Sequence, residues 1–496
     1  MNSVNVDDVD RWVLGALLPG FAGSDLPDWV RAALDAGLPG VALYGHNVTD
    51  DESLPRLAAL VRAGWPDALV AVDEEGGDVT RLEYLRGSSY PGNLALGTVD
   101  DETATYAVGR ALAADLRAAG INVDLAPSVD VNSSADNPVI GVRSFGATAE
   151  LVGRHGAAMV RGLQEGGVAS VAKHFPGHGA TTTDSHLTAP VVDADPEVVR
   201  ARDLPPFAAV VRAGVLGIMT GHVVLPALDE LPATLSRRLL VDLLRGELGF
   251  TGAVVTDALD MAAVRHRYGI PGAAERALAA GADLLLLGTL DPERSFVDTR
   301  RGLREAVLDG RVDPQRAEDA AARTRRFREA TAALTPAAPV GDRAGWHAAR
   351  AAVRTGGRPL DAGELAAGLV VVELRATTNE AVGDAGWTLA GPVAALGVQV
   401  ERIVVQDGCP APAEVLAGAA GRQVVVAVRD AYRSPWQRAW TTALLQARPD
   451  AVLVGLGMPD DEALVRAAAG PRARWAMGLS ASRVSAEAVA DALVRG

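Results

Sequence analysis

The first two-thirds of the chain alternates short apolar runs with longer amphipathic stretches. Eight runs have the length of buried strands: Val13–Leu18, Gly40–Tyr44, Leu69–Val72, Ile121–Ala126, Val168–Ala172, Leu216–Thr220, Ala253–Thr256 and Leu284–Leu287. Between them, apolar residues recur at helical spacing, as in Leu54–Ala63, Thr103–Ala118, Ala149–Gln164 and Arg237–Arg245. This order predicts an α/β fold, a (β/α)8 TIM barrel rather than an open doubly wound sheet. No G-x-G-x-x-G turn follows the first run, which argues against dinucleotide binding.

A second, smaller domain follows a change of composition near residue 335. A helical pattern from Asp313 to Ala332 gives way to the Pro- and Ala-rich residues 334–340, which indicate a linker, and a helix is expected at Trp346–Arg354. New apolar runs then lie at Leu369–Leu374, Ile403–Val405, Gln423–Val428 and Ala451–Gly455. We predict a TIM-barrel catalytic domain over residues 1–335, a linker with a helix over 336–366, and a smaller α/β sandwich-type C-terminal domain with a mostly parallel sheet over 367–496.

Polar residues directly follow four of the predicted barrel strands. These are Asp73 with Glu74 and Glu75 after the third, Lys173-His174 after the fifth, Gly221-His222 after the sixth, and Asp257 after the seventh. One such residue would mean little, because aspartate is common in turns. Four at one rim predict a functional site, since barrel enzymes place their chemistry at the carboxyl ends of the strands.

The stretch from Lys173 to Gly179 concentrates unusual residues. Lys173 is the single lysine among 47 basic residues, and three of the eight histidines lie between positions 174 and 186. The ammonium of lysine is a compact hydrogen-bond donor, whereas the guanidinium of arginine is planar and donates from several fixed directions. A lysine at this position therefore indicates a contact that differs from those of the arginines. Pro176 and the nearby glycines disfavour a helix, and we expect the whole stretch to be a loop.

Two groups near this rim suit acid–base and nucleophilic chemistry. Asp257 is a carboxylate in an apolar frame, which suits a nucleophile. His186 can gain and lose a proton near neutral pH, and Asp184, two residues earlier, can orient its ring. A nucleophilic carboxylate facing an acid/base group is typical of a retaining glycosidase. Two readings stay open: Asp260 faces the site instead of Asp257, or Asp184 only caps a helix.

The spacing of the histidines and the composition of the chain argue against several other kinds of site and partner. His174 and His178 have the i, i+4 spacing of zinc ligands, but Pro176 removes the helix that would align them, so we expect no metal and no other cofactor. A net charge of −15 without a basic block argues against nucleic-acid binding. The single Cys409 excludes an intramolecular disulfide and is expected to be buried or half-buried. The acidic start of the chain and its short apolar run predict a cytoplasmic protein, with neither signal peptide nor membrane span.

Four segments resemble family-3 glycoside hydrolases, and more narrowly their β-N-acetylhexosaminidase branch. They are residues 72–81, 137–146, 173–179 together with 184–186, and 255–259. The resemblance covers the chain from about Leu18 to Gly288 in matching order, and the C-terminal region is similar only to the diverged second domain of two-domain members. It implies that Asp257 is the nucleophile that forms a covalent glycosyl-enzyme and that His186, oriented by Asp184, is the acid/base.

The resemblance also implies a sugar pocket. Asp73 would bind hydroxyls far from the scissile bond, and the non-reducing end would be completed by Arg81, Arg143, Lys173 and His174. The sequence departs from the family at Asp78, where arginine is usual. The β-glucosidase branch takes its acid from a glutamate of the second domain; no comparable motif is present here. We therefore expect Glu373 and Glu401 to be ordinary surface or strand-end acids and the second domain to be structural.

The expected function is a retaining, exo-acting β-N-acetylglucosaminidase that removes terminal β-linked N-acetylglucosamine from a small carbohydrate during cell-wall fragment recycling. A phosphorylase is the runner-up, because a neutral imidazole repels incoming phosphate less than a carboxylate base would. A β-glucosidase-like exo-hydrolase is the third reading. A non-catalytic sugar-binding barrel is disfavoured, since Asp257, His186 and Asp184 are all present. The sequence leaves the oligomeric state open.

Overall fold

The computed structural model describes residues 5–181, 190–338, 343–375 and 386–496. The chain divides into two compact units: the first comprises residues 1–75, 102–140 and 144–340, and the second comprises 76–101, 141–143 and 341–496. The second unit thus includes two short segments from the first third of the chain, whereas each predicted domain was one continuous segment. The predicted boundaries at residues 335 and 366 stay a prediction.

Within the described residues, the first unit contains a ring of eight short parallel strands. They are β1 (Leu17–Leu18), β2 (Gly40–Ala42), β3 (Leu69–Val72), β4 (Val123–Asp124), β5 (Ala169–Phe175), β6 (Gly217–Thr220), β9 (Ala253–Thr256) and β10 (Leu285–Leu286). Six pair in the order β2-β3-β4-β5-β6-β9, and β1 pairs with β10. The amide of Leu284 donates to Val254 (3.1 Å), and the amide of Ala42 donates to Pro19 (3.0 Å), which closes the ring. The predicted (β/α)8 barrel is confirmed.

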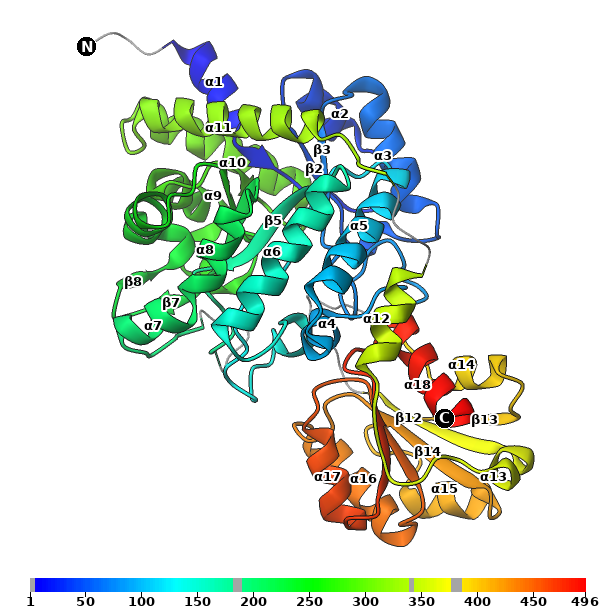
Figure 1. The fold of residues 1–496 in the computed structure, drawn as a ribbon. Helices are drawn as coiled ribbons and strands as arrows, with labels where there is room; N and C mark the ends of the chain where they lie inside the picture. Colours follow the sequence, from blue (N-terminus) through cyan, green and yellow to red (C-terminus); the bar gives the residue numbers. More distant parts are fainter. Residues whose placement is uncertain (1–4, 182–189, 339–342, 376–385) are drawn as a thin grey trace. The chain divides into compact units, whose positions relative to one another are not determined.

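Helices cover the outside of this barrel, as α6 and α8 do in Figure 1. The helices of the first unit are α1 (Val6–Leu14), α2 (Asp28–Asp35), α3 (Ser53–Gly64), α5 (Glu102–Ala118), α6 (Ala149–Glu165), α7 (Pro196–Arg202), α8 (Leu204–Arg212), η4 (Arg238–Glu247), α9 (Ala262–Ala280), α10 (Pro292–Leu308) and α11 (Pro314–Ala333). The predicted amphipathic stretches correspond to α3, α5, α6 and η4 within two residues at each end. Every residue of β3, β5, β6 and β9 is buried, as expected for strands covered on both faces.

Two local predictions in the barrel are wrong. The run Val13–Leu18 is a strand only in its last two residues, because Val13 belongs to α1. The predicted loop does not begin at Lys173, because β5 continues through Phe175 with a shift of register after Ala172. The backbone of Lys173 explains the extension: its amide donates to Pro127 (3.0 Å) and its carbonyl accepts from Val129 (2.7 Å). These bonds to the segment after β4 outweigh the local turn signals.

A six-stranded sheet forms the centre of the second unit. Its order is β11 (Arg354–Gly356), β16 (Arg474–Met477), β15 (Val452–Gly455), β14 (Gln423–Val428), β12 (Leu369–Arg375) and β13 (Val400–Gln406). All neighbouring strands are parallel except β11 and β16, which confirms the mostly parallel sheet. The short strands β11 and β16 were not among the predicted runs. β11 is Arg-Thr-Gly and contains no apolar run, and the arginine that begins β16 leaves an apolar run of only three residues within the strand.

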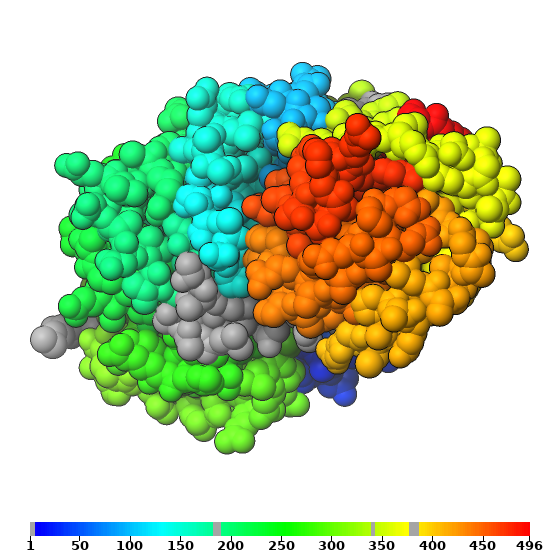
Figure 2. Space-filling view, turned by 90° about the horizontal axis from the view of Figure 1, so that it is seen from below, coloured from blue at the N-terminus to red at the C-terminus, as the bar shows by residue number. Residues whose placement is uncertain are grey.

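Helices cover both faces of this sheet (Figure 1). One face packs against α15 (Pro412–Ala419), α16 (Pro435–Ala447) and α17 (Asp461–Ala469), and the other packs against α14 (Ala390–Ala395) and α18 (Arg483–Arg495). The segments from earlier in the chain add α4 (Asn93–Val99), which contacts α12 (Ala344–Ala352). The space-filling view shows the yellow-to-red residues of this unit as one closely packed body (Figure 2).

One expectation for the second unit is wrong, and one acid is more deeply buried than an ordinary surface acid. Cys409 is exposed rather than buried, because it lies in a tight turn after β13. Glu373 is completely buried, whereas Glu401 is an exposed acid as expected. The Glu373 carboxylate is ion-paired with Arg375 (2.7 Å) and Arg402 (2.8 Å), which compensates its burial. Across the described part of the chain, no helix combines the length and the apolar character that a bilayer crossing requires.

Candidate active site

Lys173 occupies the carboxyl end of β5 as a buried cation. Its side chain is 2% exposed, and its Nζ lies 2.5 Å from Oδ1 of Asp73 and 2.7 Å from Oε1 of Glu75. Both carboxylates follow β3, so two strand ends that are far apart in sequence meet here. Asp73 is 21% exposed, whereas Glu75 is 2% exposed. Asp73 is therefore the member of this cluster that reaches solvent, with carboxylate lone pairs that can accept hydrogen bonds from a ligand.

His174, the next residue of β5, is held by a buried aspartate. Its Nδ1 lies 2.7 Å from Oδ2 of Asp130, and the amide of His178 donates to Oδ1 of the same carboxylate (2.7 Å). Burial by itself raises the pKa of Asp130, but the two histidines and their hydrogen bonds outweigh it and lower the pKa to about 2. Asp130 is thus an anion at neutral pH. It keeps a proton on Nδ1 of His174 and fixes the orientation of the ring.

His178 lies beside this pair as a neutral ring. Burial lowers the pKa of His178 to about 4, against the raising effect of the carboxylates of Asp130 and Asp257. Its Nδ1 is within 2.8 Å of the Thr181 hydroxyl, and its Nε2 has no hydrogen-bond partner among the described residues. Asp257 follows β9, which pairs with β6 next to β5, so it lies at the same rim of the barrel as the histidines that end or follow β5.

Asp257 directly follows β9, and its neighbour is fixed by a buried histidine. The amide of Asp257 donates to the carbonyl of Thr220 (3.1 Å), and the amide of Ala258 donates to the Asp257 carboxylate (2.8 Å). Nε2 of His222 donates to the carbonyl of Ala258 (2.9 Å). His222, which follows β6, therefore orients the turn that carries Asp257.

Asp260 is bound to the loop after β10. Its carboxylate accepts hydrogen bonds from the amides of Thr289 (2.7 Å) and Leu290 (3.0 Å), directly after β10. Burial raises the pKa of Asp260, and these two amide hydrogen bonds partly oppose the increase. Asp260 thus shapes the loop after β10, and this geometry favours Asp257 as the reactive carboxylate.

Asn137 joins two of the sequence segments that suggested the site. Its side-chain amide donates to the carbonyl of His178 (2.8 Å), and its Oδ1 accepts from the amides of Val139 (2.9 Å) and Ile140 (2.8 Å). The segment 137–140 is thereby tied to the turn after β5. This contact explains why an asparagine begins that segment.

Four of the predicted site residues lie outside the described residues of the first unit. Asp184 and His186 lie outside the described residues, so their assignment stays a prediction. Arg81 and Arg143 belong to the second unit, where both are buried. Their assignment to the sugar likewise stays a prediction.

Two acidic residues of the cluster were missed by sequence reasoning. Asp130 follows β4 by several residues, and no sequence signal identifies it as the partner of His174. Asp124 ends β4 and accepts a hydrogen bond from the amide of Glu74 (3.0 Å). Burial raises the pKa of Asp124 well above its usual value, although the Glu74 amide and the charge of Lys173 oppose this. Its place at a strand end is the signal that would have revealed it.

In the part of the chain that the structure describes, no group of three or more histidine, cysteine, aspartate or glutamate side chains is arranged to hold a metal ion. Instead, the carboxylate of Asp130 is paired with His174, and the carboxylate of Asp73 is paired with Lys173.

Comparisons with known proteins agree with this geometry. Residues 28–327 match the model of the glycosyl hydrolase family 3 N-terminal domain. A β-hexosaminidase of Nitrosomonas eutropha is 36% identical over 309 residues, which cover 58% of this chain and 88% of that protein. β-Hexosaminidase A of Pseudoalteromonas piscicida is 38% identical over 270 residues, 50% of this chain, but the match spans only 45% of that relative.

A solved structure extends the likeness to both units. A family-3 β-N-acetylglucosaminidase from Paenibacillus sp. str. FPU-7 superposes with a TM-score of 0.87 at 31% identity, covering 98% of this chain and 96% of that one. The barrel, the carboxylates at its strand ends and the family match define a glycoside hydrolase. More narrowly, the chain belongs to glycosyl hydrolase family 3.

Proposed function

We propose that this enzyme is a retaining, exo-acting β-N-acetylglucosaminidase. The observation that carries the proposal is the cluster of Lys173, Asp73 and Glu75 at the carboxyl ends of β3 and β5, in the same unit as Asp257. The names of the β-hexosaminidases from Nitrosomonas and Pseudoalteromonas support the same class of substrate. The substrate would be a small carbohydrate with a terminal β-linked N-acetylglucosamine.

The proposed division of labour separates binding from bond cleavage. Asp73 accepts hydrogen bonds from sugar hydroxyls, and Lys173 and His174 fix the non-reducing end together with Arg81 and Arg143. The contacts of Asp73 are far from the bond that breaks, and their binding energy helps to distort the sugar ring. The buried pairs of Lys173 and His174 support this role, because both side chains are held before the substrate arrives.

In the proposed reaction, Asp257 attacks the anomeric carbon while His186 protonates the leaving oxygen. This step forms a covalent glycosyl–aspartate ester and releases the aglycone. His186 then takes a proton from water, which attacks the ester and releases the sugar with its configuration retained. Asp184 orients the ring of His186 in both steps. His222, through the carbonyl of Ala258, supports the placement of Asp257.

A role inside the cell, on fragments derived from the cell wall, is the physiological part of the proposal. It rests on the small, exo-type substrate that the residues suggest.

The initial rate on an aryl β-N-acetylglucosaminide, with and without added phosphate, tests the activity. We expect free N-acetylglucosamine at a rate that phosphate does not change. A phosphate-stimulated rate that yields the sugar 1-phosphate would instead establish the phosphorylase reading. A higher kcat/KM on the matched aryl β-glucoside would favour the β-glucosidase-like reading, and no turnover of either substrate would refute the proposal.

A further inference from the structure

Asp78, which stands where the family usually has arginine, is completely buried in the second unit. Its Oδ1 accepts a hydrogen bond from the amide of Ala481 (2.7 Å), and the hydroxyl of Ser480 lies 3.3 Å from the same oxygen. Its Oδ2 lies 2.6 Å from Nη2 of Arg429, which follows β14. The residue that departs from the family pattern is therefore paired with a cation from the sheet of the second unit.

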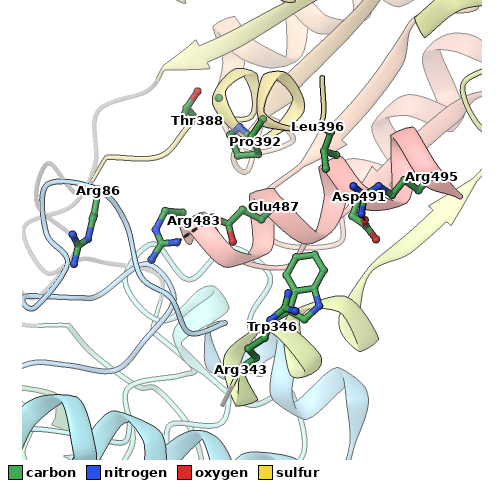
Figure 3. Close-up of a pocket in the computed structure, with 12 residues that line it drawn as sticks. Arg86, Arg343, Trp346, Thr388, Pro392, Leu396, Arg483, Glu487, Asp491 and Arg495 are labelled. Atoms are coloured by element: carbon green, nitrogen blue, oxygen red, sulfur yellow. Dashed lines mark hydrogen bonds and ion pairs between the residues drawn. The ribbon is translucent and has the colours of Figure 1, made fainter. Parts of the chain in front are cut away.

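Glu83 lies, like Asp78, in residues 76–101, the early segment of the second unit, and attaches this segment to residues 341–496 at a second point. Nη2 of Arg483 donates to its Oε1 at 2.8 Å, and the Glu83 side chain is only 14% exposed. Arg483 begins α18 and also donates to Glu487 one turn further on (3.0 Å), as the close-up shows (Figure 3). The early segment is thus held at two points by arginines from residues 341–496.

Arg81 lies between these two attachments. Its side chain is buried, its Nη1 donates to the carbonyl of Thr80 (3.2 Å), and its guanidinium lies 6.0 Å from the centre of the Tyr84 ring. The preceding Gly77 has φ +63°, and a Cβ there would come within 2.4 Å of Cα of Gly92. The backbone before Arg81 is therefore packed too closely to shift freely.

We propose that the second unit positions Arg81 for the sugar through the Asp78–Arg429 and Glu83–Arg483 pairs. This inference rests on the proposed function, which assigns Arg81 to the substrate. The four paired side chains are positioning residues, because they act through Arg81 and not on the reacting atoms. The Asp78–Arg429 pair also explains the departure from the family: an arginine at position 78 would face the cation of Arg429, and like charges repel at this separation.

Amide hydrogen exchange of the peptide that spans residues 78–83 tests the positioning independently of activity. Arg429→Gln removes one partner of the buried pair, and we expect exchange in this peptide to become about tenfold faster. The control is Arg466→Gln, the same chemical change in an exposed pair with Glu462 (2.7 Å), and it should leave the peptide unchanged. Arg429→Lys keeps the charge and should restore most of the protection.

Kinetics on the aryl β-N-acetylglucosaminide complete the test. Because Arg81 is expected to bind the sugar equally in the ground and transition states, Arg429→Gln should raise KM about tenfold and leave kcat within about twofold. The double variant Asp78→Arg with Arg429→Asp should recover part of this loss, since the pair is restored with reversed charges.

Failure of the proposed function and failure of the positioning of Arg81 would give different experimental results. An inactive wild-type enzyme would refute the proposed function, and the assignment of Arg81 to a sugar would fall with it. An active wild type whose Arg429→Gln variant shows unchanged exchange, or faster exchange with unchanged KM, would overturn only the positioning. If Arg429→Gln does not fold, Glu83→Gln, which weakens the other attachment, is compared with Arg466→Gln by the same two readouts.

Discussion

At the scale of single residues, the site consists of charges placed where water is largely excluded. Lys173 is bound by Asp73 and Glu75, and His174 is bound by Asp130. A buried charge is tolerated when its partners are in place, and removing one partner leaves the other charge uncompensated. The single lysine of the chain is thus retained at a position where two carboxylates converge on one compact ammonium.

Lys173→Met should lower both stability and activity. It leaves two carboxylates without their cation, so we expect a loss of about 3 kcal/mol in the free energy of unfolding. We also expect kcat/KM to fall at least about 100-fold, because Asp73 loses its fixed position. Urea unfolding and steady-state kinetics measure the two effects. Arg56→Met, which alters an exposed pair with Asp50, is the control; equal losses in both variants would contradict the account.

His178 makes the stability of the enzyme depend on pH in a defined window. Burial lowers the pKa of His178 in the folded protein from 6.5 to about 4, so the unfolded chain binds its proton first as the pH falls. The contribution of the neutral His178 ring to the free energy of unfolding is fully present above pH 6.5 and is lost as the pH falls from 6.5 to 4. The shift corresponds to about 3 kcal/mol.

His178→Gln should flatten that part of the pH profile of the free energy of unfolding. His266→Gln makes the same change at an exposed position and should leave the slope between pH 6.5 and 4 as it is in the wild type. An unchanged slope in His178→Gln would show that this ring is not the group that titrates.

At the scale of elements, chemistry and stability occupy opposite ends of the barrel strands. Asp283 lies just before β10, at the amino end of the strands, and is completely buried. It binds Arg316 of α11 (2.6 Å), the amide of Val254 in β9 (2.9 Å) and Arg245 of η4 (2.5 Å). One carboxylate therefore joins two helices to two strands, far along the strands from Lys173 and Asp257.

Asp283→Ala should lower stability without lowering intrinsic activity. Two partly buried arginines lose their shared anion, so we expect the free energy of unfolding to fall by about 3 kcal/mol. At a temperature where the variant stays folded, kcat/KM should remain within about twofold of wild type. Asp298→Ala breaks exposed pairs with Arg294 and Arg301 and should cost about 0.5 kcal/mol or less. A large loss of kcat/KM in folded Asp283→Ala would contradict this separation.

Strands could be predicted from the sequence more readily than contacts between residues that are far apart in the chain. All eight barrel strands were predicted, because each is a continuous apolar run and this pattern is local. The rule that polar residues at strand ends mark the site located Asp73, Lys173 and Asp257, and it would have located Asp124 had it been applied to the fourth strand. Asp130 was not predictable in this way, because its role depends on pairing with a strand more than 40 residues later.

At the scale of the whole molecule, the described part of each unit has apolar core clusters of its own. In the second unit, apolar residues from α16 and α18 pack on opposite faces of one sheet. In the first, alternate strand residues such as Leu69 and Ala71 of β3 pack in the core cluster of the barrel unit. Glu373 illustrates what sequence could not supply: it was expected to be an ordinary surface or strand-end acid, and its burial and its pairing with arginines of β12 and β13 were not predicted.

Cavity-forming substitutions in each core should report on separate cooperative units. Val426→Ala in β14 and Val254→Ala in β9 remove the same atoms from fully buried positions. We expect each to cost about 2 kcal/mol and to speed amide exchange chiefly within its own unit. Native-state hydrogen exchange measures both. Equal acceleration in the two units by either variant would show that the chain opens as one.

The central claim is that Asp257 forms a covalent bond with the sugar. Brief reaction with an activated aryl N-acetylglucosaminide, acid quenching and peptide mass spectrometry measure this directly. The account predicts one added N-acetylglucosaminyl group on the carboxylate of Asp257, and no adduct in Asp257→Ala. An adduct on another residue, or an active enzyme that never forms one and releases the inverted sugar, would contradict it.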